Sequence, residues 1–205
     1  MNNEPVLFYY NPMSRGQVIH RMLEEINAPY EIKFIDWKIN QQKSPEFLAI
    51  NPMGKIPAIV HRGVVVTEVA AICMYLADAF PEAKLAPSVD DPKRGEYYRW
   101  FMFTINCVEA AVIDKSMPRE KTMPESALGY GTYEKTMSVL QNAVEKDFLL
   151  GEQFTAADLY LSSYLQWFFM QKVLPETPIL LNYVARCMDR PGTKSFLKKR
   201  AEMMP

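Results

Sequence analysis

The hydrophobic pattern of the N-terminal part of the chain changes its period several times, and this alternation constrains the fold more than any other feature. Residues 5–10 read Pro-Val-Leu-Phe-Tyr-Tyr, a strand-like run that Asn11-Pro12 ends. Apolar residues then recur at helical spacing from Val18 to Ile26, and residues 31–35 alternate polar and apolar side chains as a half-buried strand does. The sequence therefore predicts a strand–helix–strand unit.

The same domain is expected to continue to residue 80. The patterns predict a short helix over 44–50, a strand, turn and strand over 57–66, and a third helix with Thr67 as its N-cap. Residues 81–92 contain three prolines and no periodic pattern, which is typical of a linker. We therefore expect one α/β domain over 1–80 and a second domain over 93–205.

The second domain is predicted to be entirely helical. Its expected helices are a long, aromatic-rich one from Lys93, one over 133–148, one starting at Thr155, and two shorter ones over 179–188 and 193–203. The fold class indicated by the sequence is α/β followed by all-α.

Composition excludes several function classes. The chain has 205 residues, with 23 Lys and Arg against 24 Asp and Glu, so a formal net charge of -1 gives no reason to expect nucleic acid or an anionic membrane as partner. Neither a signal peptide nor an apolar run of about 18 residues is visible, so we expect a cytoplasmic protein. Three scattered cysteines and two histidines favour neither a disulfide framework, a metal site nor a Ser-His-Asp triad.

Ser14 stands where the first predicted helix begins. Ser14 and Gln17 have the spacing of a capping box, which needs no further function. A hydroxyl has one donor and two acceptor lone pairs, so Ser14 can accept from the Gln17 backbone N–H and still donate to a bound thiolate. Capping and catalysis are therefore compatible at this residue.

Three further motifs give the chain a family resemblance. Gly54-Lys55-Ile56-Pro57-Ala58 resembles a cis-proline loop, Thr67-Glu68 resembles the acidic start of a third helix, and residues 154–158 (Phe-Thr-Ala-Ala-Asp) resemble a capping box of a helical domain. Together with the element order, they resemble the cytosolic glutathione S-transferases over the whole chain, and in particular bacterial members of serine type. The resemblance implies a thioredoxin-like N-terminal domain and a C-terminal helical bundle.

The resemblance implies a glutathione site in the N-terminal domain. Ile56, before a cis Pro57, would pair with the cysteinyl backbone of glutathione, and Lys55 would meet its glycyl carboxylate. Glu68 would meet the amine of the γ-glutamyl group, and the Val69 N–H would meet the carboxylate of the same group. The family usually has Ser or Thr where this chain has Val69, so a side-chain hydroxyl bond is lost. Each residue also has a simpler interpretation, as a strand-initiating proline, a solvated lysine or a helix-dipole carboxylate.

The catalytic task implied by the family is to keep the thiol of glutathione ionised. Ser14 matches the serine of the serine-type classes, with Arg15 adding a positive field. Tyr10, two residues before Pro12, is an alternative that matches the tyrosine-type classes. No cysteine lies in this segment, which disfavours a branch that forms a mixed disulfide with its own thiol.

The resemblance further implies a small hydrophobic electrophile as second substrate and a detoxifying conjugation reaction, with glutathione as co-substrate and no other cofactor. Aromatic, Met and aliphatic side chains of the helical domain are candidates for the electrophile pocket, although such residues more often form the core. They are Tyr98, Met102, Ile105 and Trp167. A homodimer is expected. The alternatives are a non-catalytic binding or scaffold protein of the same fold, and a glutathione-dependent peroxidase or isomerase.

Overall fold

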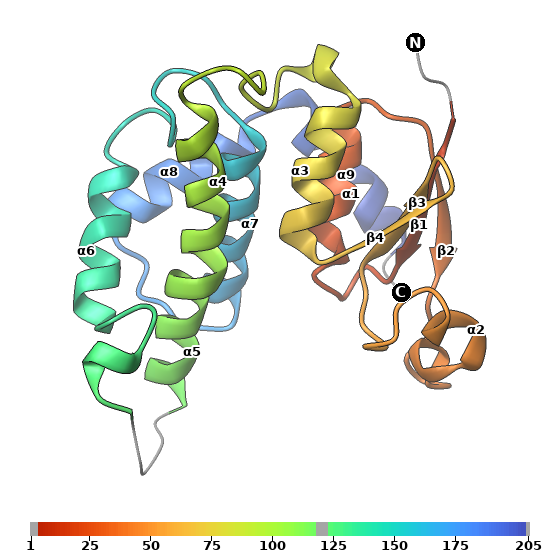
Figure 1. Ribbon diagram of the computed structural model, residues 1–205, viewed down its shortest axis with the longest axis horizontal. Helices are drawn as coiled ribbons and strands as arrows, with labels where there is room; N and C mark the ends of the chain where they lie inside the picture. The colour runs from red at the N-terminus through yellow and green to blue at the C-terminus, as the bar shows by residue number, and fades with distance from the viewer. Residues whose placement is uncertain (1–3, 118–122, 204–205) are drawn as a thin grey trace. The chain divides into compact units, whose positions relative to one another are not determined.

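The structure is a computed structural model that describes residues 4–117 and 123–203. The chain forms two compact units, one from the residues up to Leu85 together with those from Arg190, and the other from Ala86–Asp189. The predicted division placed all residues from 93 onward in one domain, so the structure differs in assigning the last helix to the first unit. Figure 1 shows the elements of each unit.

A four-stranded mixed sheet forms the centre of the first unit. Its strands are β1 (Val6–Tyr10), β2 (Tyr30–Phe34), β3 (Ala58–His61) and β4 (Val64–Thr67). They lie in the order β2-β1-β3-β4, with β1 and β2 parallel and the other pairs antiparallel. This arrangement confirms the predicted thioredoxin-like domain.

Two long helices lie against one face of this sheet (Figure 1). Val6, Phe8 and Tyr10 of β1 are fully buried on the side of α1 (Gly16–Glu25) and α3 (Val69–Ala79). The opposite face carries the 3-10 turn η1 (Gln41–Lys43) and the short helix α2 (Pro45–Leu48). Phe47 of α2 packs there with Ile35 and Ala58, because alternate strand residues point to opposite faces.

The start of α3 differs from the prediction. Thr67 is the last residue of β4, where it pairs with Ala58, and Glu68 is the N-cap of α3. The expectation that Thr67 caps the helix was therefore wrong, because strand pairing extends one residue further than the hydrophobic pattern suggested.

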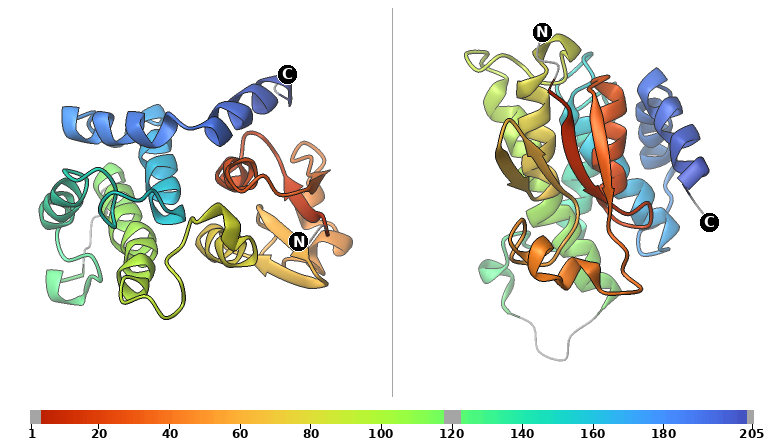
Figure 2. Two further views of the ribbon diagram at one scale, coloured as in Figure 1. Left: turned by 90° about the horizontal axis from the view of Figure 1, so that it is seen from above. Right: turned by 90° about the vertical axis from the view of Figure 1, so that its right-hand side faces the viewer.

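The last helix, α9 (Pro191–Met203), packs beside α1, as both views of Figure 2 show. Polar contacts fix its position. Arg190 forms an ion pair of 2.9 Å with Glu25, and Thr193 Oγ1 donates to the same carboxylate at 2.8 Å. Arg21 Nε donates to Thr193 Oγ1 at 2.8 Å. These contacts explain why α9 belongs to the first unit although its sequence continues the helical pattern of the second.

The second unit is helical, as predicted. It contains α4 (Arg94–Phe103), the π-helical segment η3 (Thr104–Glu109), α5 (Ala110–Ser116), α6 (Tyr133–Ala143), α7 (Ala156–Met170) and α8 (Pro178–Met188), besides the 3-10 turn η4 (Glu125–Ala127). A further 3-10 turn, η2 (Pro81–Ala83), belongs to the first unit. The capping box of Thr155 and Asp158 is confirmed, and α6 ends five residues before the predicted end at Phe148.

Candidate functional site

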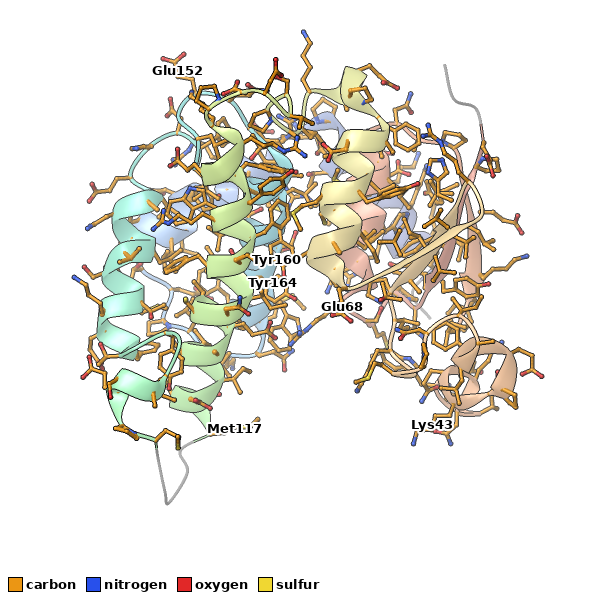
Figure 3. The ribbon with its side chains drawn as sticks, viewed as in Figure 1. Lys43, Glu68, Met117, Glu152, Tyr160 and Tyr164 are labelled. Carbon is orange, nitrogen blue, oxygen red and sulfur yellow. The ribbon has the colours of Figure 1, made fainter. Side chains whose placement is uncertain are left out.

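Three segments of the first unit converge at one end of its sheet. The strand register pairs Tyr9 with Ala58 and Ala58 with Thr67. The residues that follow β1, precede β3 and follow β4 are therefore neighbours. They are the turn 11–15, the loop 55–57 and the first residues of α3, which Figure 3 marks at Glu68. The structure thus brings together the predicted residues of the N-terminal domain.

The turn that carries Ser14 is tightly bonded. Ser14 Oγ donates to the Asn11 carbonyl oxygen at 2.7 Å and accepts from the Gly16 N–H at 2.9 Å. The Asn11 side chain donates to the Ile35 carbonyl oxygen at 2.9 Å, which ties the turn to the end of β2. These bonds hold Ser14 in place, with 7% of its surface exposed.

The predicted capping box at Ser14 is absent. The Gln17 N–H donates to the Ser14 backbone carbonyl, and the N-cap of α1 is Arg15. The hydroxyl instead accepts from the residue two positions on, as in a serine turn, because the helix starts later than expected. To serve a thiolate, the hydroxyl must turn its proton away from the Asn11 carbonyl. That carbonyl would keep its bond from the Ser14 N–H, at 2.9 Å.

Tyr10 lies in a different environment from Ser14, although four positions separate them. Its side chain is 0% exposed and stacks on Phe8, with the two ring centroids 4.8 Å apart. Its hydroxyl lies 3.4 Å from His20 Nδ1. Desolvation by burial raises the Tyr10 pKa to about 12, against an opposing effect of the Arg200 charge. This burial favours Ser14 over Tyr10 as the group that can reach a ligand.

His20 connects Tyr10 to a buried chain of polar groups. His20 Nε2 lies 3.0 Å from the Tyr30 hydroxyl, which donates to Glu24 at 2.6 Å. Because Tyr30 donates to Glu24, it can accept from His20 Nε2–H, and Nδ1 is then free to accept from Tyr10. This assignment requires neutral His20, and burial indeed lowers its pKa to about 4.

Gly16 is required by a close approach. A Cβ atom at this position would lie 2.8 Å from both Ser14 Oγ and Tyr10 Cδ2. Only glycine therefore lets the serine turn pack against the end of β1 without a shift.

The loop before β3 contains a cis peptide bond between Ile56 and Pro57. Ile56 is half-buried and lies outside the β3–β4 pairing, which begins at Ala58. Lys55 is exposed, and its carbonyl oxygen accepts from the Asn51 side chain at 2.7 Å. The backbone N–H and C=O groups of Ile56 therefore lie just before β3, at the end of the sheet where the three segments meet.

Glu68 has a backbone conformation that non-glycine residues rarely adopt. Its φ is 65° and its ψ is 121°, and its side chain is exposed at the start of α3. Strained residues of this kind concentrate at ligand sites, where the surrounding structure maintains them. Val69, the next residue, is 8% exposed and contributes only its backbone N–H to this end of the helix.

A cavity of about 480 Å³ adjoins the same loop. It is lined by Trp37, Gln42, Lys43, Leu48, Met53, Gly54, Lys55 and Ile56. The polar side chains of its lining carry two ammonium groups, the Trp37 indole N–H and the Gln42 amide, whose Oε1 is buried without a hydrogen-bond partner among the described residues. The cavity therefore suits an anionic group attached to a partly apolar ligand.

Sequence reasoning missed Trp37, Gln42 and Lys43 as site residues. Gln42 and Lys43 belong to η1, next to α2, where Figure 3 labels Lys43. No periodic pattern marks this turn, so the only available signal was a lysine and two glutamines placed just before the Ser44-Pro45 helix start.

The proposed electrophile wall lies in the second unit. Tyr98 and Met102 of α4 are each 42% exposed, and Ile105 of η3 and Trp167 of α7 are half-buried. The spacing of Tyr98, Met102 and Ile105 places them along one helical face. The core interpretation is therefore wrong for Tyr98 and Met102, whereas a binding role for the four residues stays a prediction.

Residues 4–117 and 123–203 contain no helix that is both long and apolar enough to cross a membrane. In the same part of the chain, no group of three or more His, Cys, Asp or Glu side chains is arranged to hold a metal ion.

Comparison with known proteins agrees with this geometry. Residues 5–78 match the family described as Glutathione S-transferase, N-terminal domain, and residues 103–191 match Glutathione S-transferase, C-terminal domain. Glutathione S-transferase 1 of Schizosaccharomyces pombe is 25% identical, and the match covers 89% of this chain and 90% of that protein.

Solved structures show the same fold. Glutathione transferase URE2P8 from Phanerochaete chrysosporium, with oxidized glutathione, matches with a TM-score of 0.77 at 24% identity, covering 99% of this chain and 98% of that chain. A glutathione transferase from Burkholderia graminis, with two glutathione molecules bound per subunit, has a TM-score of 0.74 at 25% identity, covering 95% and 88%. The two family domains together span most of the sequence, and the chain therefore belongs to the glutathione S-transferase family of enzymes.

Proposed function

We propose that this chain is a serine-type glutathione transferase, which binds glutathione in its first unit and uses Ser14 to keep the thiol ionised. The observation that carries the proposal is the convergence of the Ser14 turn, the Ile56-Pro57 loop and Glu68 at one end of the sheet. The Burkholderia graminis structure contains glutathione and the Phanerochaete chrysosporium structure contains oxidized glutathione, which supports the choice of ligand.

Each part of glutathione has a complementary group in this arrangement. The Ile56 backbone pairs with the cysteinyl backbone like an added strand. The glycyl carboxylate enters the cavity between Lys43 and Lys55, where Gln42 also contributes its amide. Glu68 meets the γ-glutamyl amine, and the first N–H groups of α3 meet the γ-glutamyl carboxylate.

The energy required of Ser14 is within reach of one hydrogen bond. A free thiol has a pKa of about 8.5, and lowering it by about 2 units requires about 2.7 kcal/mol. A hydrogen bond to a charged group contributes about 1.5–3 kcal/mol, and a helix N-terminus about 0.3–1 kcal/mol. Ser14 lies at the start of α1, so both effects act on a sulfur bound there.

The reaction that follows is a conjugation. The thiolate sulfur forms a bond to an electrophilic carbon of a small apolar molecule, and the group displaced from that carbon leaves with the bonding electron pair. Tyr98, Met102, Ile105 and Trp167 are proposed to contact this molecule, and detoxification is the role that such a reaction would serve. We expect a homodimer, and light scattering during gel filtration would test this oligomeric state. We also expect a cytoplasmic location.

The deciding experiment titrates bound glutathione with pH. Thiolate absorbance in the ultraviolet is followed in the wild type and in Ser14→Ala, with binding heat recorded in parallel. We expect a depressed thiol pKa in the wild type that returns towards the free value in Ser14→Ala, while binding is retained. A depressed pKa that survives in Ser14→Ala would contradict the role of Ser14 and make Tyr10 or Arg15 the catalytic candidate.

A non-catalytic binding protein is the second candidate function. It is favoured by the Ser14 proton, which is donated to Asn11 rather than outward, and by Val69, which removes a ligand hydroxyl bond. In that case the wild type would bind glutathione with an unshifted thiol pKa. A glutathione-dependent peroxidase or isomerase would share the depressed pKa and be identified by a panel of peroxides and isomerisable substrates.

A further inference from the structure

The cavity end of the site offers charged donors to a carboxylate. Lys43 and Lys55 both line the cavity, and Gln42 adds an amide with an unpartnered buried oxygen, which an amide flip would exchange for a donor nitrogen. Charge-assisted hydrogen bonds are stronger than neutral ones, and the partial enclosure of the cavity reduces their screening by solvent. A carboxylate at this end is therefore held by ionic contacts.

The first turn of α3 offers no side-chain hydrogen-bond donor. The first turn of α3 consists of Val69, Ala70 and Ala71, and none of these side chains can form a hydrogen bond. Val69 is 8% exposed, so its methyl groups are packed against the protein. From this turn, a carboxylate can receive hydrogen bonds only from backbone N–H groups.

We infer that Val69 makes this site select its thiol ligand by the carboxylate that follows the cysteine, and tolerate ligands without the γ-glutamyl α-carboxylate. The inference rests on the proposed function, because glutathione binding places the two carboxylates at these two ends. The favoured ligand class is a cysteinyl peptide with a free carboxylate after the cysteine and an amine before it. Glu68 supplies the counter-charge for that amine.

Three ligands test this selectivity on the wild-type protein by calorimetry. They are glutathione, its decarboxylated analogue γ-aminobutyryl-cysteinylglycine, which keeps the amine, and the glycyl monoethyl ester of glutathione. We expect the decarboxylated analogue to bind within about threefold of glutathione. The ester should bind at least about tenfold more weakly, because it loses a charge-assisted contact.

A matched pair of variants isolates the side chain. Val69→Thr adds a hydroxyl with nearly the same shape and should strengthen glutathione binding by about tenfold while leaving the decarboxylated analogue unchanged. Val69→Ala removes the methyl groups without adding a donor and should give no gain. The wild-type comparison of the three ligands decides the inference even if the threonine variant is unstable.

The outcomes separate the inference from the function beneath it. If the wild type binds glutathione but binds the decarboxylated analogue more than about threefold more weakly, backbone N–H groups suffice and the inference is wrong. Equal gains for both ligands in Val69→Thr would also overturn it. If glutathione itself shows no binding heat, the proposed function fails first, and the inference fails with it.

Discussion

The Ser14 turn and the buried layer between β1 and α1 each contain one hydroxyl group, that of Ser14 and that of Tyr10. The Ser14 hydroxyl donates to the Asn11 carbonyl and the Tyr10 hydroxyl to His20 Nδ1. The two acceptors differ in whether another donor remains when the hydroxyl turns away. The Asn11 carbonyl keeps a second donor when the Ser14 hydroxyl turns away, whereas His20 Nδ1 loses its Tyr10 partner inside a buried chain. The Ser14 hydroxyl can therefore turn towards a ligand without leaving its internal acceptor unpaired, whereas the Tyr10 hydroxyl cannot.

The largest expected effect is on the turn. Ser14→Ala should lower kcat/KM with an activated aryl chloride about a hundredfold at pH 6.5, which corresponds to about 2.7 kcal/mol. The loss in kcat/KM should shrink as the pH approaches about 8.5, because a growing fraction of the thiol is then ionised without a hydrogen bond from Ser14. Steady-state kinetics across this pH range provide the measurement, and Ser14→Thr, which keeps a hydroxyl, is the control. A loss that does not change with pH would contradict thiolate stabilisation.

Gly16 lies where the Ser14 turn contacts Tyr10, and its substitution gives the next prediction. Gly16→Ala places a Cβ 2.8 Å from both Ser14 Oγ and Tyr10 Cδ2, so it should destabilise the protein by about 1–3 kcal/mol and also reduce activity. Urea unfolding measures the first effect. Gly95→Ala is the matched control, since Gly95 lies in α4 and has nothing within 4 Å of an added Cβ. That control should be neutral or stabilising by about 0.5–1 kcal/mol.

The buried layer should show a pH dependence that the turn lacks. The folded pKa of His20 is about 4, below its ordinary value of 6.5, so only the unfolded chain takes up this proton between those values. Stability is therefore fully present above pH 6.5 and falls as the pH drops towards 4. Between pH 7.5 and 5, His20 should account for a loss of about 2 kcal/mol.

His20→Gln tests this dependence by urea unfolding at both pH values. The variant should be less stable at pH 7.5 but should lose about 2 kcal/mol less than the wild type on acidification. Glu24, Lys199 and Arg200 also act on His20, and all three are retained in the variant. An identical acid loss in the two proteins would mean that the chain of polar groups can accommodate the imidazolium.

Much of this comparison was accessible from the sequence. The period changes predicted the sheet and helices, and the family resemblance carried by Lys55-Ile56-Pro57 and Glu68 predicted the position of the candidate site. Strand parity was the signal for Tyr10, because it shares a face with Val6 and Phe8, both fully buried. The parity was visible, but nothing in the sequence says which face of β1 is covered by α1 and α3.

Other features depend on contacts between distant residues. The helical pattern of residues 193–203 predicts a helix but not its partner, which Thr193 and Arg190 select through Arg21 and Glu25. The N-cap of α3 moved from Thr67 to Glu68 because pairing with Ala58 keeps Thr67 in β4. Gln42 and Lys43 line the cavity because η1 lies next to the loop before β3.

The smallest expected effect provides the strictest test of the comparison. Tyr10→Phe removes a hydroxyl that is 0% exposed and lies 3.4 Å from His20, a long and weak hydrogen bond. We expect a stability loss of only about 0.5–1 kcal/mol and an unchanged thiol pKa for bound glutathione. Urea unfolding and ultraviolet titration measure the two quantities on the same sample. If the thiol pKa rose in Tyr10→Phe as it is expected to in Ser14→Ala, the buried hydroxyl would have to reach the sulfur, and burial would be no guide to which of the two groups is catalytic.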